Sequence, residues 1–166
     1  KIMVLGAVKK PGTYNISSLA TLFNALYVSG GPSENGSFRN IELVRNSKVI
    51  LKADLYDFLL NSNQKANVRL MDNDVIKIPY AKIQVDIAGE VNREGTFEIQ
   101  PNETLENLIQ FAGGYKSNAF KARISGLRNT DFDRQVLDIV KDSIKSFTPK
   151  NGDSYAVGSI INKFQN

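Results

Sequence analysis

The chain has 166 residues, a net charge of +4 and 42% hydrophobic residues, which is enough apolar material for a packed core. It contains no cysteine, which excludes disulfides, thiolate nucleophiles, cysteine-ligated zinc and iron–sulfur clusters. It also contains no histidine, so the Ser-His-Asp and Cys-His groupings of hydrolases cannot form. We therefore predict that the protein is not an enzyme, has no catalytic residues, and binds no cofactor and no metal ion.

The positive charge is small and dispersed, so it does not indicate a nucleic acid partner. No apolar run approaches the roughly 18 residues that a membrane-spanning helix needs. The chain opens directly on residues 1–5, which already have the pattern of a strand. We therefore expect it to be a piece of a longer protein, whose targeting segment lies elsewhere.

An internal repeat organises the sequence. Residues 4–16 match residues 87–99 at a constant offset of 83, and the same offset relates 21–45 to 104–128 without a gap. Among the matched pairs are Gly6 and Gly89, Gly12 and Gly95, Thr13 and Thr96, Thr21 and Thr104, Leu22 and Leu105, Gly30 and Gly113, and Gly31 and Gly114. The sequence therefore predicts two domains, 1–80 and 84–160, followed by a tail at 161–166.

The first copy begins with a predicted hairpin. Residues 2–8 and 13–16 have strand character, and Pro11 and Gly12 suit the two central positions of a type II turn between them. Glycine within a strand, as at Gly6 and at Gly89 of the second copy, indicates a bulge or a close backbone approach.

A short helix follows the hairpin in both copies. Apolar residues recur at spacings of three and four, at 22, 25 and 26 and again at 105, 108 and 109. Thr21 and Thr104 precede these stripes as N-caps, and the glycine pairs at 30–31 and 113–114 end the helices. Because each helix is too short to be stable alone, its stripe must pack on the sheet.

The rest of the first copy contains a second hairpin (41–45 and 49–52, with a turn at 46–48), a helix at 55–60 capped by Asp54, and a last strand at 75–79. The acidic turn at 72–74 lacks the glycine and glutamate spacing of an EF-hand, so local Asx hydrogen bonds explain it better than calcium. The second copy is looser here, with 127–131, 138–144 and 155–157 in the corresponding places.

This order of hairpin, helix, further strands and closing strand predicts an α+β fold of two tandem β-grasp domains, each a mixed sheet with a short helix on one face. Other β-grasp functions do not fit. Ferredoxins need four cysteines. Sulfur carriers and ubiquitin-like proteins use an exposed C-terminal Gly-Gly, whereas the glycine pairs here follow helices.

Two motifs carry a family resemblance. The first copy contains Leu5-Gly6-Ala7-Val8-Lys9-Lys10-Pro11-Gly12-Thr13-Tyr14 and, after the helix, Val28-Ser29-Gly30-Gly31. The second contains Ala88-Gly89-Glu90-Val91-Asn92-Arg93-Glu94-Gly95-Thr96-Phe97 and Phe111-Ala112-Gly113-Gly114. In this repeated order the chain resembles the SLBB domain (soluble-ligand-binding β-grasp) of bacterial polysaccharide export proteins.

The resemblance implies a place in the cell envelope. It implies a periplasmic module of an export assembly for capsular or exopolysaccharide, in a parent protein anchored at the outer membrane. The implied partners are further copies in a homo-oligomer, other export components and the polysaccharide. Two functions remain open: a structural module acting through subunit contacts, and a receptor for a sugar or other soluble ligand. A pocket with converging aromatic and polar groups would favour the receptor.

Charge differs between the copies. Residues 1–83 have 11 basic and 6 acidic side chains, a net charge of +5, whereas residues 84–166 have 10 and 11, a net charge of −1. The candidate interaction residues are Lys9 and Lys10 in the first copy and Asp86, Glu90, Glu94 and Glu98 in the second. We expect the acidic residues to form either a solvated sheet face or a stripe that meets a basic surface of a neighbouring subunit.

Aromatic residues are candidates for sugar stacking. Tyr115 and Phe120, in the loop after the second glycine pair, are the candidate glycan contacts. Tyr14 and Phe97 occupy equivalent positions in the two hairpins, which favours a packing role for them. Eight glycines are assigned to the structural motif: Gly6, Gly12, Gly30, Gly31, Gly89, Gly95, Gly113 and Gly114.

Overall fold

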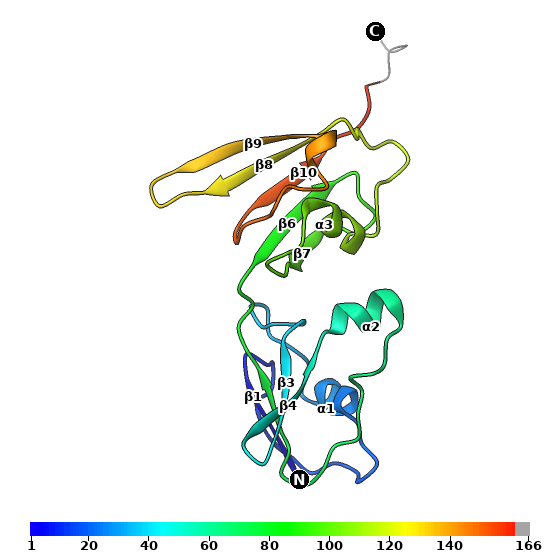
Figure 1. Ribbon diagram of the computed structural model, residues 1–166, viewed down its shortest axis with the longest axis vertical. Helices are drawn as coiled ribbons and strands as arrows, with labels where there is room; N and C mark the ends of the chain where they lie inside the picture. Colours follow the sequence, from blue (N-terminus) through cyan, green and yellow to red (C-terminus); the bar gives the residue numbers. More distant parts are fainter. Residues whose placement is uncertain (162–166) are drawn as a thin grey trace. The chain divides into compact units, whose positions relative to one another are not determined.

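The computed structural model describes residues 1–161, and these fold into two compact units. The first unit is Lys1–Lys82 and the second begins at Ile83 (Figure 1). All but the first residue of the predicted tail, 161–166, lies outside the described residues. Within the described part of the chain, no helix is long and apolar enough to cross a membrane.

The first unit is a five-stranded mixed sheet with the order β2-β1-β5-β3-β4. Only β1 and β5 form a parallel pair, and the other pairs are antiparallel. The strands are β1 (Ile2–Gly6), β2 (Gly12–Tyr14), β3 (Ile41–Arg45), β4 (Lys48–Ala53) and β5 (Val75–Ile78), and the helices are α1 (Leu22–Val28) and α2 (Leu55–Asn61).

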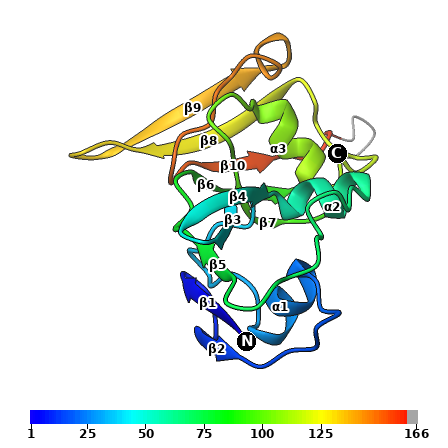
Figure 2. The ribbon, with the colours of Figure 1, turned by 60° about the horizontal axis from the view of Figure 1, so that its bottom comes forward.

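The second unit repeats this topology, with the sheet order β7-β6-β10-β8-β9 and one parallel pair, β6 and β10 (Figure 2). Its elements are β6 (Gln84–Gly89), β7 (Gly95–Glu98), α3 (Leu105–Phe111), β8 (Arg123–Asn129), β9 (Arg134–Val140), the 3-10 turn η1 (Lys141–Ser143) and β10 (Ser154–Val157). The predicted α+β fold of two tandem β-grasp domains is confirmed.

The predicted helix stripes form the contact between helix and sheet. In α1, Leu22, Ala25 and Leu26 are buried, in one core cluster with sheet residues such as Val4 and Ile76. The corresponding residues of α3, at 105, 108 and 109, are buried as well. The Thr21 hydroxyl caps α1 by accepting from the Asn24 amide, and the Asn24 side chain accepts from the Thr21 amide in return.

The first turn prediction is wrong in detail. Gly12 does not close a tight turn but begins β2, where it pairs with Val4 at a φ of 149°. Gly95 does the same opposite Ile87, at a φ of 153°. The chain from β1 to β2 is therefore a longer loop, which crosses to the end of the helix before it returns.

The parallel drawn between residues 138–144 and the second helix is also wrong. Asp138 lies in β9, and only the three residues of η1 are helical there. Within the described part of the second unit, no α-helix corresponds to α2. The two units therefore share a sheet and a first helix and differ in the segment after the second hairpin.

Candidate functional site

The two glycine motifs of each unit meet in space. After β1, the amides of Lys9 and Lys10 donate to the carbonyls of Gly31 and Ser29, at 3.0 and 2.9 Å. In the second unit the amides of Asn92 and Arg93 donate to the carbonyls at 114 and 112, at 3.0 and 2.7 Å. The hairpin loop is thus fastened to the carboxyl end of the helix, which explains why the two motifs occur together.

Gly6 and Gly89 allow the first and last strands of each unit to approach each other closely. Both have a left-handed φ, of 92° and 95°. A Cβ on Gly6 would lie 2.2 Å from the Ile78 carbonyl oxygen, and one on Gly89 would lie 2.1 Å from that of Val157. The predicted close approach at both glycines is confirmed.

A buried ion pair recurs in the two units. Arg45 donates twice to Asp74, at 2.8 Å each, and Arg128 donates to Asp153, with the shortest bond at 2.8 Å. Burial raises the pKa of Asp74, but hydrogen bonds from Arg45 and from the Met71 amide outweigh it, so the pKa is lowered overall. The bond from Met71 across the acidic turn confirms the local Asx interpretation.

The Asp153 carboxylate is held in the same way. Its pKa is raised by burial but lowered more strongly by hydrogen bonds from Arg128, Tyr155 and the Lys150 amide. Burial and the neighbouring carboxylate raise the pKa of Tyr155. Both aspartates therefore stay charged within a structural ion pair, with no acid–base role indicated.

An apolar groove lies between α1 and α2 of the first unit. It has a volume of about 450 Å³, and six of its lining residues are Phe23, Leu26, Tyr27, Phe38, Phe58 and Leu59. The rings of Phe23 and Phe58 contact each other in its lining, with centroids 4.8 Å apart and planes tilted by 59°. Among the described residues that line it, the Tyr27 hydroxyl is the only polar side-chain group.

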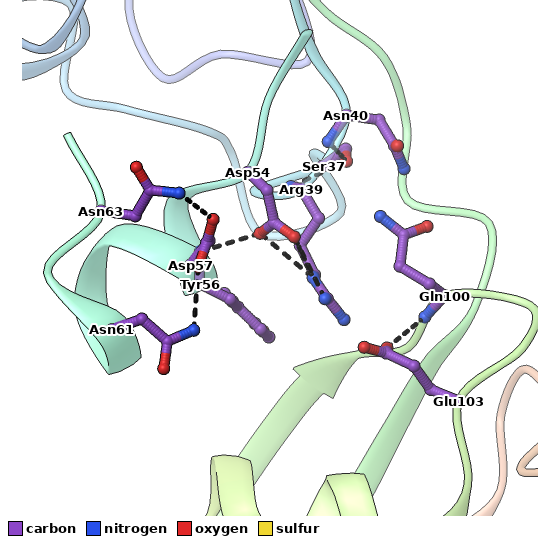
Figure 3. A network of polar contacts seen from close by, with 10 residues as sticks. All are labelled: Ser37, Arg39, Asn40, Asp54, Tyr56, Asp57, Asn61, Asn63, Gln100 and Glu103. Carbon is purple, nitrogen blue, oxygen red and sulfur yellow. Dashed lines mark hydrogen bonds and ion pairs between the residues drawn. The ribbon is translucent and has the colours of Figure 1, made fainter. Parts of the chain in front are cut away.

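Polar residues hold α2, one wall of this groove, in position (Figure 3). Asp54 accepts from the Tyr56 amide at 2.9 Å and from the Arg39 guanidinium at 3.1–3.2 Å. The guanidinium also stacks over the Tyr56 ring, 4.9 Å from its centre. Asp54 therefore caps the helix, as predicted, and also ties it to the loop before β3.

Asp57 stabilises the same helix. It accepts from Asn61 at 2.8 Å and from Asn63 at 2.6 Å, and these hydrogen bonds lower its pKa. The bonds link the first turn of α2 to its last residue, Asn61, and to Asn63, which comes after the helix.

The predicted acidic residues do not form one exposed stripe. Asp86 and Glu94 are exposed, and Asp86 accepts from the Thr96 hydroxyl at 2.5 Å. Glu90 is partly buried and accepts from Ser159 at 2.9 Å. Glu98, however, is only 3% exposed, so its place in a solvent-facing stripe is corrected.

The predicted basic residues are exposed. Lys9 and Lys10 both reach solvent from the loop after β1. A Cβ on Gly30 would lie 3.0 Å from the Cβ of Lys9. Because Gly30 also lines the apolar groove, Lys9 lies directly beside it.

The aromatic candidates have two different environments. Tyr115 is partly buried, with the Lys121 ammonium 5.5 Å from its ring centre, and burial and Glu106 raise its pKa. Phe120 is exposed in the same loop. Tyr14 packs on the core with its hydroxyl donating to the Lys10 carbonyl, and Phe97 is buried, which confirms the packing interpretation of this pair.

Sequence reasoning missed the groove, although the repeat contains a signal for it. At the offset of 83, Phe23 and Tyr27 of α1 correspond to Glu106 and Gln110 of α3. Aromatic residues on the helix flank thus occur in one copy only. That difference, together with the apolar residues of α2, marks the first unit as the one with an unusual apolar surface.

Comparisons with known proteins agree with this architecture. The family model described as "SLBB domain" matches residues 1–53 and 84–129, the corresponding part of each unit. Two Escherichia coli proteins named "Polysialic acid transport protein KpsD" are 32% identical over 101 residues, which cover 60% of this chain and 18% of each relative. The chain therefore spans less than a fifth of the length of these relatives. With matches in both units over more than half of its residues, the chain belongs to the SLBB domain family.

Proposed function

We propose that the chain is an interaction module of a bacterial polysaccharide export protein and works through contacts between subunits. The observation that carries the proposal is the SLBB match in both units combined with the similarity to proteins named for polysialic acid transport. Because the chain matches only 18% of those relatives, it acts as one part of a larger protein. The proposal places that protein in the periplasm, anchored at the outer membrane, with 1–80 and 84–160 as its two SLBB domains.

The fold suits such a role. The buried charged groups make structural contacts, as in the two Arg–Asp pairs. Among the described residues, no cluster of three or more His, Cys, Asp or Glu residues is arranged to hold a metal ion. The exposed charged and apolar side chains are the groups available for contacts with other proteins.

An in-frame deletion tests this function. Residues 1–161 would be removed from the chromosomal gene, and surface polysaccharide would be measured with total polysaccharide as the reference. We expect the surface fraction to fall while synthesis continues, with restoration by the intact gene. Unchanged surface polysaccharide would refute a role in export.

Glycan contact is a second candidate, favoured by the aromatic pair in the loop 115–120. Phe120 exposes its ring, and Tyr115 lies beside the Lys121 ammonium, a combination of ring face and charge that suits an acidic sugar. Titration of the purified chain with the exported oligosaccharide should show binding that Phe120→Ala weakens. Equal binding by Phe120→Ala and the parent sequence would contradict this assignment.

A further inference from the structure

The groove of the first unit is an open apolar surface. Tyr27 is 87% exposed and Leu59 is 67% exposed, although both line it. A sugar in such a groove would lose hydrogen bonds to water and find few polar side chains in exchange. An apolar side chain, by contrast, needs no hydrogen-bonding partners there. The chemistry of the groove therefore favours a hydrophobic knob over a glycan.

The second unit presents a knob of this kind. Its hairpin extends past the rest of the sheet, since β10 pairs with β8 only as far as Leu127, whereas β8 and β9 continue to Asn129 and Arg134 (Figure 1). Phe132 lies in the four-residue loop at the tip and is 97% exposed. So large an exposed ring has no role in the packing of its own unit.

Hydrogen bonds hold the backbone of the tip in place. The Thr130 hydroxyl accepts from the amides of Phe132 and Asp133, at 3.3 and 3.0 Å, and lies 2.6 Å from the Asp133 carboxylate. The backbone closes the loop with a bond of 2.8 Å from the Thr130 amide to the Asp133 carbonyl. These bonds fix the backbone of the tip, so little backbone entropy is lost when the tip binds a partner.

Knob and groove belong to different repeats. The matching hairpin of the first unit ends in a two-residue turn, with Asn46 and Ser47 at φ values of 51° and 66°, and has no protruding tip. The described part of the second unit lacks a counterpart of α2, and so lacks one wall of the groove. The two features are thus the places where the copies diverge in structure.

The charges around the two features are opposite. Asp131 and Asp133 flank the ring at the hairpin tip, and both are exposed. Lys9 lies beside the groove, and Lys10 comes next in the same loop. An acidic rim around the knob and a basic rim beside the groove would orient the approach of the two surfaces.

We propose that Phe132 of one copy inserts into the groove between α1 and α2 of a second copy. The contact joins two different surfaces, so it leaves a knob and a groove open on each pair for further copies, as in a ring. This inference rests on the proposed role in subunit contacts and identifies the surfaces that make them.

Cysteine cross-linking tests the contact without background, because the chain has no cysteine of its own. The Asp131→Cys variant, which keeps the Phe132 ring beside the new thiol, is mixed with the Leu59→Cys variant and treated with a short bismaleimide. The control mixture replaces the second partner by Leu19→Cys, because Leu19 is 66% exposed, almost the same as Leu59, but does not line the groove. Products are separated by size, and the joined peptides are identified by mass spectrometry.

We expect the Leu59 mixture to give at least about fivefold more 131–59 product than the control gives 131–19 product, because insertion of the Phe132 ring raises the local concentration of the tip at the groove. The excess should shrink in high salt as the charges are screened. The excess of the product joined to Leu59→Cys should also disappear when Phe23→Asp is added to the copy that supplies the groove. Equal yields in both mixtures, or no product in either, would overturn the proposal. This conclusion would be the same for an empty groove and for a groove occupied by another ligand.

Removing the ring itself tests its role in the contact. Phe132→Ser, added to the Asp131→Cys copy, should abolish the excess of 131–59 product. It changes a side chain that is 97% exposed, so the fold should persist, as thermal unfolding would verify. Deletion of the module tests the export function separately. If cross-linking shows the contact but deletion of the module leaves export intact, the contact stands and the export role fails. If deletion abolishes export but the 131–59 product is absent, the export role stands and this interface is wrong.

Discussion

At the residue scale, a few side-chain and backbone positions carry most of the geometric constraint. Gly6 and Gly89 bring the first strand of each unit against the last, at a distance that leaves no space for a Cβ. Asp74 and Asp153 then lock the other end of those last strands through paired arginines. The consequences of changing these residues can be derived directly from their contacts.

Gly6→Ala should destabilise the first unit by about 3–5 kcal/mol, because it combines a left-handed φ with overlap against the Ile78 carbonyl. Denaturant unfolding measures the loss. The matched control is Gly158→Ala, where φ lies outside the left-handed region and nothing lies within 4 Å of the added Cβ. A small effect of Gly6→Ala, comparable with that of the control, would contradict the close approach.

Asp74→Asn should lower the free energy of unfolding by about 3 kcal/mol, because it leaves Arg45 without its buried counter-charge.

The same ion pairs predict that stability depends on pH. The folded pKa values of Asp74 and Asp153 lie below the ordinary value of 3.8, so their contribution is present above that pH and is lost as the pH falls through the lower folded values. The variant should show a shallower acid-induced decline in unfolding free energy than the parent. Identical pH profiles would exclude this contribution from Asp74.

At the element scale, the second helix distinguishes the two units. α2 is only seven residues long and is held by Asp54, which serves both as N-cap and as partner of Arg39. Without it, α1 would carry Phe23 and Tyr27 on an open flank rather than beside a groove. In the second unit, the segment that follows β9 forms only the 3-10 turn η1.

Asp54→Ala should therefore cost more than the loss of a simple cap. Thr21→Ala, which removes a cap without an ion pair, should cost about 1 kcal/mol, and Asp54→Ala about 2–3 kcal/mol, since Arg39 is left without this carboxylate. Asp54→Asn, which can keep the cap, should fall between them. Denaturation midpoints give the order, and equal losses for the two alanine variants would show that the ion pair contributes nothing.

Local elements were accessible to sequence reasoning where the signal is short-range. The stripes of α1 and α3, the Thr21 cap and the glycine stops are all periodic or local features, and the structure confirms them. The type II turn at Pro11 failed because a residue-level turn preference was overridden by long-range bonds from Lys9 and Lys10 to the helix end. The helix parallel at 138–144 failed because pairing along the whole of β8 extended β9.

At the scale of the whole molecule, the charge difference between the repeats is the main electrostatic feature, with net charges of +5 and −1. We propose that the exposed carboxylates of the second repeat meet a basic surface of a neighbouring subunit. Glu94 and Asp86 are exposed, and Glu90 is partly so.

Reversing Glu90 and Glu94 to lysine in the parent protein should weaken its assembly, most clearly at low salt, where charges are least screened. Each exposed pair contributes only about 0–1 kcal/mol, so the effect should be a shift in the association midpoint rather than its abolition. Sedimentation at several salt concentrations measures it. Glu103→Lys and Glu106→Lys together provide a control with the same charge change elsewhere in the repeat. Equal shifts for both double variants would show that Glu90 and Glu94 act only through the net charge of the repeat.

The sequence by itself determined the repeat, the strands of the two sheets, the buried helix stripes and the glycines where the first and last strands approach closely. Each of these depends on local periodicity or on a conformation that only glycine adopts easily. Only the tertiary structure decided that Glu98 is buried, that Asp74 and Asp153 pair with distant arginines, and that the first repeat has a groove and the second a protruding hairpin. Burial and pairing depend on which segments, far apart in sequence, come to lie side by side, and no local pattern contains that information.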